Sequence, residues 1–276
     1  MSGTTLAGRL YGRALTWRAM LTNARATNRV RTGLIASCAV DLVLYVLHRS
    51  ARPTPLIYVS AIVDIRVRRR FYRFSMRQGS DDLYSCLPGR EHDVEATILD
   101  LLRPGDVFVD VGANVGYYTI LASEIVGDSG RVIAVEPVPE TAAVMNSNVG
   151  LNHAANVDVV PKACWSARGT VSIWVPSGPY GLASLKARRA RGSLQSVEAV
   201  TLDELCQGIS QIRLIKIDVE GAEHEVLLGA TETLAKTEFL VVELSENPDQ
   251  ARGLLHDASF GVRDLNFRPY VLASRD

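Results

Sequence analysis

An apolar run that ends in an acid, followed by two closely spaced glycines, is the feature that most constrains how this chain can fold. Residues 107–116 read VFVDVGANVG, and residues 131–137 read RVIAVEP, so a second apolar run also ends in an acid. This order predicts a strand, a tight turn, a helix and a second strand. In an open parallel sheet, such a unit forms a ligand pocket at the carboxyl ends of the strands. The pattern therefore predicts a pocket for a cofactor that carries adenosine.

Strand and helix patterns alternate along the chain after position 107. Strands are expected at 107–111, 132–136, 157–161, 212–218 and 239–244, and helices at 117–125, 141–151 and 222–234. Shorter elements are expected as a helix at 93–102, a hairpin at 170–175, a helix after Thr201 and a strand pair at 261–273. Strands that alternate with helices predict an α/β fold with a doubly wound, mostly parallel sheet and right-handed crossovers.

The N-terminal part of the chain is strongly basic. Residues 1–80 hold 14 Arg and no Lys against Asp41 and Asp64, which gives a net charge of +12. The remaining 16 basic and 28 acidic residues give −12, so the whole chain is neutral. A basic segment joined to an acidic domain favours an anionic partner, either a membrane or a nucleic acid. A solvated arm that carries its arginines on the outside is the alternative.

This basic part is expected to fold as an N-terminal extension. Helices are predicted over residues 1–52, where prolines follow, and a β-hairpin over residues 56–74. An apolar stretch at 33–47 contains Asp41, and it is too short for a spanning helix of about 20 residues. It suits either an interfacial helix or a helix packed on the catalytic domain. The chain is therefore divided into an extension, residues 1–85, and a catalytic domain, residues 86–276.

The compartment is inferred from the N-terminus and the cysteines. Residues 1–8 are small and polar, so no signal peptide is expected. The four cysteines lie far apart without a Cys-x-x-Cys pair, which is typical of free thiols in a reducing compartment. The chain is therefore expected in the cytoplasm. Peripheral attachment of residues 1–52 to an anionic membrane is a further alternative. The sequence does not define an oligomeric state.

The turn after the first core strand decides which cofactor is expected. Residues 112–116 read GANVG, so Asn114 stands where a dinucleotide fingerprint needs its middle glycine. A carboxylate such as Asp110 at the strand end repels a pyrophosphate but attracts an ammonium group. S-adenosylmethionine carries an ammonium group, a carboxylate that Asn114 and the helix N-terminus can bind, and ribose hydroxyls that suit Glu136. The alternative is that the glycines only shape the turn and Asp110 caps a helix.

Four segments of the chain together resemble the FkbM family of methyltransferases. They read DVFVDVGANVGYYT, VIAVEP, IRLIKIDVEGAEHEVLLGA and LVVEL, and the most specific part is KIDVEGAE at 216–223. The resemblance covers roughly residues 86 to 245. It implies a Rossmann-like class I methyltransferase fold, S-adenosylmethionine as cofactor, and O-methylation of small molecules, sugars or glycolipids. The expected cofactor site comprises Asp110, Gly112, Ala113, Asn114, Gly116, Tyr117 and Glu136.

Methyl transfer to oxygen needs a group that removes the hydroxyl proton as the new bond forms. Asp218 is the first candidate, because it ends a strand that should neighbour the cofactor strand at the sheet edge where ligands bind. Glu220 and Glu243 are further catalytic candidates, and His224 is a competing base. Acids at a helix start also offset the helix dipole without any catalysis, which is the alternative for Glu220. The three acids also suit Mg²⁺, but we expect a mechanism without a metal.

The expected acceptor is a hydroxyl of a small molecule, a sugar or a lipid-linked substrate. The loop at 176–195 is rich in Gly, Ser and Arg, so it is either a cover for the acceptor or a solvated basic loop. Its residues that suit a polar or anionic acceptor are Tyr180, Ser184, Lys186, Arg188, Arg189 and Arg191.

Two other functions are weighed against this one. A nucleic-acid methyltransferase would use the arginines on the phosphate backbone. However, residues 218–221 read DVEG, where base-amine methyltransferases carry an Asp/Asn-Pro-Pro-aromatic motif, so nucleic acid is not the expected partner. The third hypothesis is a nucleotide-binding module without catalysis, which Asn114 and the strand-end acids oppose.

Overall fold

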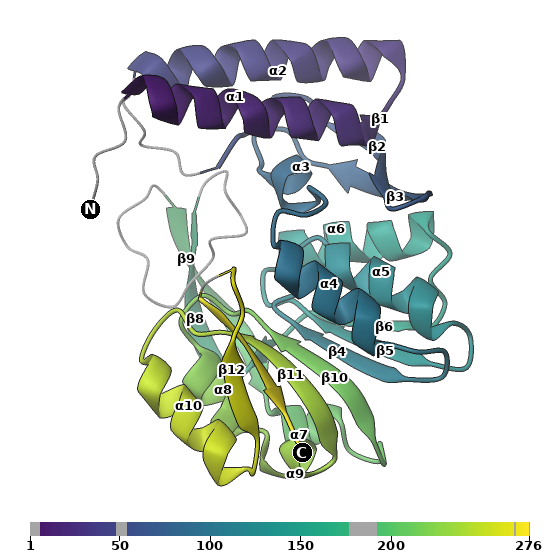
Figure 1. The fold of residues 1–276 in the computed structure, drawn as a ribbon, viewed down its shortest axis with the longest axis vertical. Helices are drawn as coiled ribbons and strands as arrows, with labels where there is room; N and C mark the ends of the chain where they lie inside the picture. The colour runs from purple at the N-terminus through teal and green to yellow at the C-terminus, as the bar shows by residue number, and fades with distance from the viewer. Residues whose placement is uncertain (1–5, 48–53, 177–191, 268, 276) are drawn as a thin grey trace. The chain divides into compact units, whose positions relative to one another are not determined.

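The computed structural model of this chain describes residues 6–47, 54–176, 192–267 and 269–275 (Figure 1). The described residues form two compact units, one that ends at Arg90 and one that begins at Glu91. The loop side chains expected to contact the acceptor, at positions 180–191, lie outside the described residues.

The first unit combines two helices with a small antiparallel sheet. Helices α1 (Leu6–Asn23) and α2 (Asn28–Leu47) lie side by side and are joined through β1 (Ala24–Arg25) (Figure 1). Strand β1 pairs with β2 (Ala61–Val67), which forms a hairpin with β3 (Arg70–Met76), and α3 (Asp82–Ser85) follows. Alternate residues of β2 are buried, as a strand with one covered face requires. The predicted helices and β-hairpin are therefore confirmed.

Helix α2 is longer than the apolar stretch from which it is predicted. It begins at Asn28 and has 20 residues. Among the described residues it is the one helix that is long and apolar enough to cross a membrane, judged by length and composition alone. The expectation that this segment is too short to span is therefore wrong, because residues 28–32 add more than one helical turn. Length and composition do not by themselves make α2 a membrane span.

The second unit is built on a seven-stranded sheet with the order β12-β13-β11-β10-β4-β5-β6. The parallel strands are β4 (Val107–Val111), β5 (Arg131–Val135), β6 (Val157–Val160), β10 (Ile212–Ile217) and β11 (Thr237–Glu243). Strand β13 (Tyr270–Ser274) runs antiparallel beside β11, and β12 (Gly261–Asp264) runs antiparallel beside β13. The strand order reverses between β4 and β10, so their carboxyl ends form a switch point where ligands bind. The predicted doubly wound, mostly parallel sheet is confirmed.

Helices cover both faces of this sheet (Figure 1). On one face lie α4 (His92–Leu101), α5 (Tyr117–Val126) and α6 (Pro139–Leu151), and on the other α8 (Glu223–Leu228), α9 (Thr231–Ala235) and α10 (Pro248–Asp257). Side chains alternate along a strand, so Val109 and Val111 join the large apolar core beneath α8, α9 and α10. Asp110 points to the opposite face, where its carboxylate meets α5.

Two parts of the second unit differ from the sequence prediction. The single helix predicted at 222–234 is two helices, and the break falls at Gly229, where a Cβ would overlap the carbonyl oxygen of Trp165. The hairpin predicted at 170–175 is strand β8 (Gly169–Pro176) of a separate small sheet with β7 (Ala163–Cys164) and β9 (Gly192–Val200). Helix α7 (Leu202–Leu205) begins after Thr201 as predicted, because Thr201 and Glu204 form a reciprocal capping box.

Candidate active site

The turn after β4 is held between the ends of two neighbouring strands. The backbone N–H groups of Gly112 and Ala113 donate to the carbonyl oxygen of Val135 at 2.9 and 3.0 Å, and the N–H of Asp218 donates to that of Val111 at 3.0 Å. Gly112 has a φ of +78°, and a Cβ there would overlap the carbonyl oxygen of Asp218. Only glycine fits this position, and the turn lies in direct contact with the backbone that carries Asp218.

Glu136 holds the backbone of this turn with both carboxylate oxygens. Its Oε2 accepts the N–H of Asn114 at 3.0 Å, and its Oε1 accepts the N–H of Val138 at 2.9 Å. Asn114 has a φ of +51°, a left-handed conformation in which Asn is enriched. Glu136 therefore joins the turn after β4 to the loop that follows β5.

Helix α5 begins directly after the turn and presents its N-terminal end there. Its N-cap is Gly116, with a φ of +88°, and among the described side chains none caps the helix. The first turn of α5 contains no acidic residue, so the partial positive charge of this end favours a carboxylate. Tyr117 donates its hydroxyl to Oε2 of Glu95 at 2.7 Å, and Ala113 is buried against Met145 of α6.

Asp110 is fully buried beneath the turn. Its Oδ2 accepts the hydroxyl of Thr119 on α5 at 2.7 Å, and its Oδ1 lies 3.9 Å from Nζ of Lys216. Among the described atoms, that Oδ1 has no hydrogen-bond partner. Burial raises the pKa of Asp110, although Lys216 and Thr119 act in the opposite direction. The carboxylate therefore links β4 to α5 and to β10.

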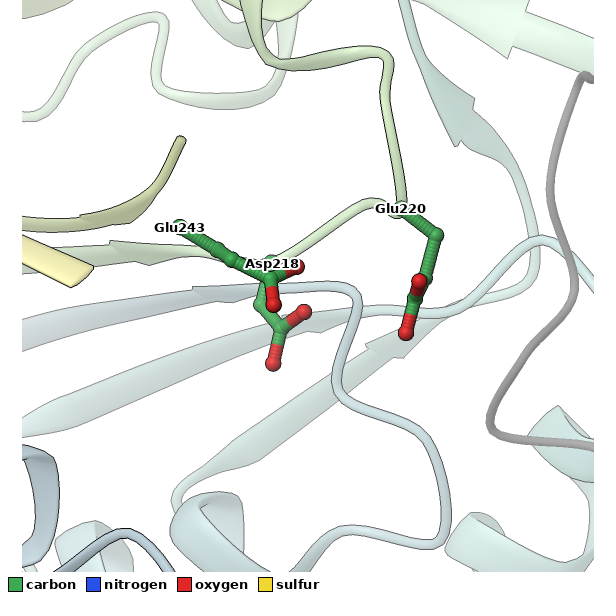
Figure 2. A group of neighbouring side chains, drawn as sticks. All are labelled: Asp218, Glu220 and Glu243. Atoms are coloured by element: carbon green, nitrogen blue, oxygen red, sulfur yellow. The ribbon is translucent and has the colours of Figure 1, made fainter. Parts of the chain in front are cut away.

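The three expected catalytic carboxylates meet at the carboxyl ends of β10 and β11. One oxygen of each of Asp218, Glu220 and Glu243 lies within 4.8 Å of the others. Figure 2 shows Glu243 beside Asp218, with Glu220 arriving from the loop that follows β10. Three carboxylates this close can either hold a cation or share protons.

Asp218 and Glu243 titrate as a pair. Burial acts to raise the pKa of Asp218, but the charge of Lys216 and hydrogen bonds from Glu243, Lys216 and Tyr270 outweigh burial and lower this pKa. Burial, and next the negative charge of Asp218, raise the pKa of Glu243 to about 10. The pair therefore holds one proton at neutral pH, which Glu243 carries while Asp218 is ionised.

Lys216 and Tyr270 complete this network, and sequence reasoning missed both. Nζ of Lys216 lies 3.0 Å from Oδ2 of Asp218, and the Tyr270 hydroxyl donates to the same oxygen at 2.8 Å. Burial acts to lower the pKa of Lys216, but Asp218 and Asp110 raise it above its usual value, so the lysine stays charged. A lysine inside the apolar strand IRLIKI was a visible signal. No local pattern in the sequence marks Tyr270, because its position depends on the pairing of β13 with β11, where Tyr270 lies opposite Glu243.

The other acids and the histidine near α8 have separate positions. Helix α8 begins at Glu223, so Glu220 precedes the helix with a φ of +52°, while Glu223 lies in its first turn, where an acid offsets the helix dipole. Glu223 is buried and accepts the N–H of Gly221 at 2.9 Å. Nδ1 of His224 lies 3.5 Å from the carboxylate of Glu225, and His224 is not part of the three-carboxylate cluster.

A family model described as a methyltransferase FkbM domain matches residues 110–269, which is more than half of the chain. The chain therefore belongs to the FkbM methyltransferase family, a class of S-adenosylmethionine-dependent enzymes with the Rossmann-like sheet described above. The predicted family, enzyme class and cofactor are confirmed.

Several characterised proteins are similar to this chain. Hexuronic acid methyltransferase AglP from Haloferax volcanii is 28% identical over 176 residues, which span 62% of this chain and 70% of that protein. 2-O-methyltransferase NoeI from Sinorhizobium fredii is 30% identical over 173 residues, which span 55% and 69%. The structure of a SAM-dependent O-methyltransferase from Thermotoga maritima has a TM-score of 0.43 at 14% identity and 77% coverage of both chains. That likeness is too low to add to the fold assignment.

The residues around the turn fit S-adenosylmethionine. The strand ends carry the carboxylates Asp110, Glu136 and Asp218, which suit a ligand with positive charge and hydroxyl groups better than a pyrophosphate. The uncapped N-terminal end of α5 suits the carboxylate of the same ligand.

Proposed function

We propose that this enzyme transfers a methyl group to a hydroxyl of a sugar, or of a sugar carried on a lipid, and that Asp218 takes the hydroxyl proton. The observation that carries this proposal is the position of Asp218 directly after β10, where Lys216 and Tyr270 both hold its Oδ2 and Glu243 lies beside it. The side chain of Asp218 is 19% exposed, so a substrate hydroxyl can reach it.

Each member of the network has a distinct part in the proposed transfer. S-adenosylmethionine supplies the methyl group on its positively charged sulfur. Asp218 would accept a hydrogen bond from the acceptor hydroxyl and take its proton as the oxygen–carbon bond forms and the sulfur–carbon bond of the methyl donor breaks, which releases S-adenosylhomocysteine. Lys216 and Tyr270 fix the carboxylate through Oδ2 and keep it ionised until then. The proton on Glu243 prevents a second negative charge beside Asp218, and Glu220 lines the same cluster.

The proposed cofactor site follows the turn after β4. Glu136 accepts hydrogen bonds from the ribose hydroxyls, while Asn114 and the N-terminal end of α5 bind the methionine carboxylate. The remaining members of the proposed site are Asp110, Gly112, Ala113, Gly116 and Tyr117.

The similar proteins support a sugar as the acceptor. One is named as a hexuronic acid methyltransferase and another as a 2-O-methyltransferase. A hydroxyl on another small molecule would meet the same carboxylate, whereas nucleic acid is not the proposed partner.

We also propose a division of labour within the chain. Residues 86–276 carry the reaction in the cytoplasm without a metal, and residues 1–85 form an extension. The net charge of +12 over residues 1–80 supports peripheral contact of residues 1–52 with an anionic membrane.

A transfer assay with methyl-labelled S-adenosylmethionine tests the function. The acceptors are hexuronic acid glycosides, neutral hexose glycosides and RNA. The variants are Asp218→Asn and, as a matched control, Asp158→Asn, which changes an exposed aspartate of β6. We expect label on a sugar and a kcat lowered by about 10²–10⁴-fold in Asp218→Asn only. Label on RNA alone, or equal rates for the wild type and Asp218→Asn, would overturn the proposal.

A further inference from the structure

From position 33 to its end, helix α2 buries Ser37 and Asp41 and exposes aliphatic side chains. Its buried residues are Leu34, Ser37 and Asp41, whose spacing of three and four places them on one face. Every exposed residue from position 33 to 47 is aliphatic and lies on the opposite face. The large ones, here called the aliphatic face, are Ile35, Val40, Val43, Val46 and Leu47. A surface helix of a globular protein shows the reverse pattern, so this face is suited to an apolar partner.

The one charge between positions 32 and 47 is turned away from the aliphatic face. Asp41 accepts two hydrogen bonds from Arg13 of α1, both at 2.8 Å, and a third from the indole N–H of Trp17 at 2.8 Å. Arg13 also donates to the carbonyl oxygen of Thr54 at 2.7 Å. Asp41 and Arg13 are both buried, so the ion pair is neutralised and hydrogen-bonded inside the first unit. The aliphatic face itself carries no charge.

The first unit also carries exposed arginines on α1, β1 and the start of α2. Arg29 and Arg31 belong to the start of α2, Arg25 lies in β1, and Arg9 and Arg18 are exposed on α1. An apolar stripe beside a set of cations is the composition that binds the headgroup region of anionic lipids.

We propose that the aliphatic face of α2 docks on the surface of a bilayer that contains anionic lipids. The aliphatic side chains enter the boundary between headgroups and acyl chains, and the arginines bind lipid phosphates. A spanning orientation is disfavoured, because the Arg13–Asp41 pair ties α2 to α1, whose exposed Arg9 and Arg18 would enter the hydrocarbon. Nucleic acid would engage the arginines but would leave the aliphatic face uncovered. The inference rests on the peripheral membrane contact proposed above, and it does not depend on which molecule accepts the methyl group.

Vesicle flotation of the full chain tests this inference. The vesicles contain phosphatidylcholine alone or phosphatidylcholine mixed with phosphatidylglycerol, at low and high salt. The variants are Ile35→Gln on the aliphatic face and, as a matched control, Ile62→Gln on β2. Both isoleucines belong to the first unit and are 53% exposed. We expect salt-sensitive flotation with the mixed vesicles, weakened about tenfold or more by Ile35→Gln and not by Ile62→Gln.

Four results would overturn the inference. The first is that the protein does not float with anionic vesicles, and the second is that Ile35→Gln and the wild type float equally. The third is attachment that resists high salt and alkaline extraction, because such attachment indicates a spanning helix. The fourth is a lipid-free dimer that Ile35→Gln dissociates, because a second copy would then cover the face. Methyl transfer to a water-soluble sugar is measured on the same samples and should be equal in all three proteins, so a failure of the proposed function remains distinguishable.

Discussion

Nζ of Lys216 lies 3.0 Å from Oδ2 of Asp218, although the lysine side chain is only 3% exposed. Residues two apart along a strand face the same side, so β10 brings this cation beneath its own terminal carboxylate. The ring of Tyr118 lies 5.3 Å from the same Nζ and provides a further favourable surface for the cation. The buried lysine therefore sets the charge of the site.

Lys216→Met should destabilise the second unit. The change leaves the carboxylates of Asp110 and Asp218 without their common cation, and breaking a buried ion pair costs about 3–5 kcal/mol. Urea unfolding measures the loss, and Lys162→Met, which removes a partly exposed lysine paired with Glu198, should lose far less. Equal losses in the two variants would show that Lys216 does not neutralise the site.

Glu243→Gln should flatten the dependence of stability on pH. In the folded chain Glu243 keeps its proton up to about pH 10, whereas its ordinary pKa is 4.5. Between these values the folded state binds more protons than the unfolded state, so the free energy of unfolding falls as the pH rises. Glutamine does not titrate and keeps the size of the side chain. Urea unfolding across this window should show a shallower decline, and an unchanged slope would contradict the raised pKa.

Gly112→Ala should cost more than a left-handed backbone alone explains. Gly79 has a φ of +76°, close to that of Gly112, but a Cβ there would meet nothing within 4 Å. We expect Gly79→Ala to lose about 1–2 kcal/mol from the left-handed conformation. Gly112→Ala should lose about 1–3 kcal/mol more from the overlap with the Asp218 carbonyl. Thermal unfolding of both variants compares the losses; similar values would mean that the turn and the Asp218 loop can separate.

Glu136→Gln should weaken cofactor binding. A hydrogen bond to a charged group contributes about 1.5–3 kcal/mol, so losing the carboxylate should raise the Kd of S-adenosylhomocysteine about tenfold or more. Calorimetric titration measures this change, with Glu140→Gln on the exposed side of α6 as the control. The wild type should give no heat with NAD⁺; binding of NAD⁺ alone would contradict the cofactor site as drawn.

Removal of divalent cations should leave methyl transfer unchanged. Lys216 already places a positive charge 3.0 Å from the carboxylate of Asp218, so the cluster has a cation of its own. The check is the transfer rate before and after treatment with a chelator, with Mg²⁺ added back. A rate that falls with the chelator and returns with Mg²⁺ would assign a cation to the three-carboxylate cluster.

The centre of the site could be predicted from the sequence because its signals are local. The turn from Gly112 to Gly116 and the acids at 136, 218 and 243 each follow an apolar run. A parallel sheet brings the carboxyl ends of such runs to one edge. The run pattern alone was therefore enough to place Asp218 and Glu243 near each other.

The remaining features of the site and of the first unit depend on strand pairing and helix packing, which no local sequence pattern predicts. Tyr270 reaches Asp218 only because β13 turns back against β11 with Glu243 opposite Tyr270. The length of α2 was underestimated because the polar residues 28–32 look unlike a membrane segment but continue the helix. The burial of Asp41 likewise required a partner from α1, Arg13, which is 28 positions away.

Gly112 leaves no room for a single extra carbon between the turn after β4 and the carbonyl oxygen of Asp218. The two loops therefore cannot slide past each other, and main chain rather than side-chain choice sets the spacing between the turn after β4 and Asp218. A change of acceptor during evolution or engineering would then fall to residues outside these two loops. Selection for new substrates is thus expected to leave residues 110–118 and 216–221 almost untouched.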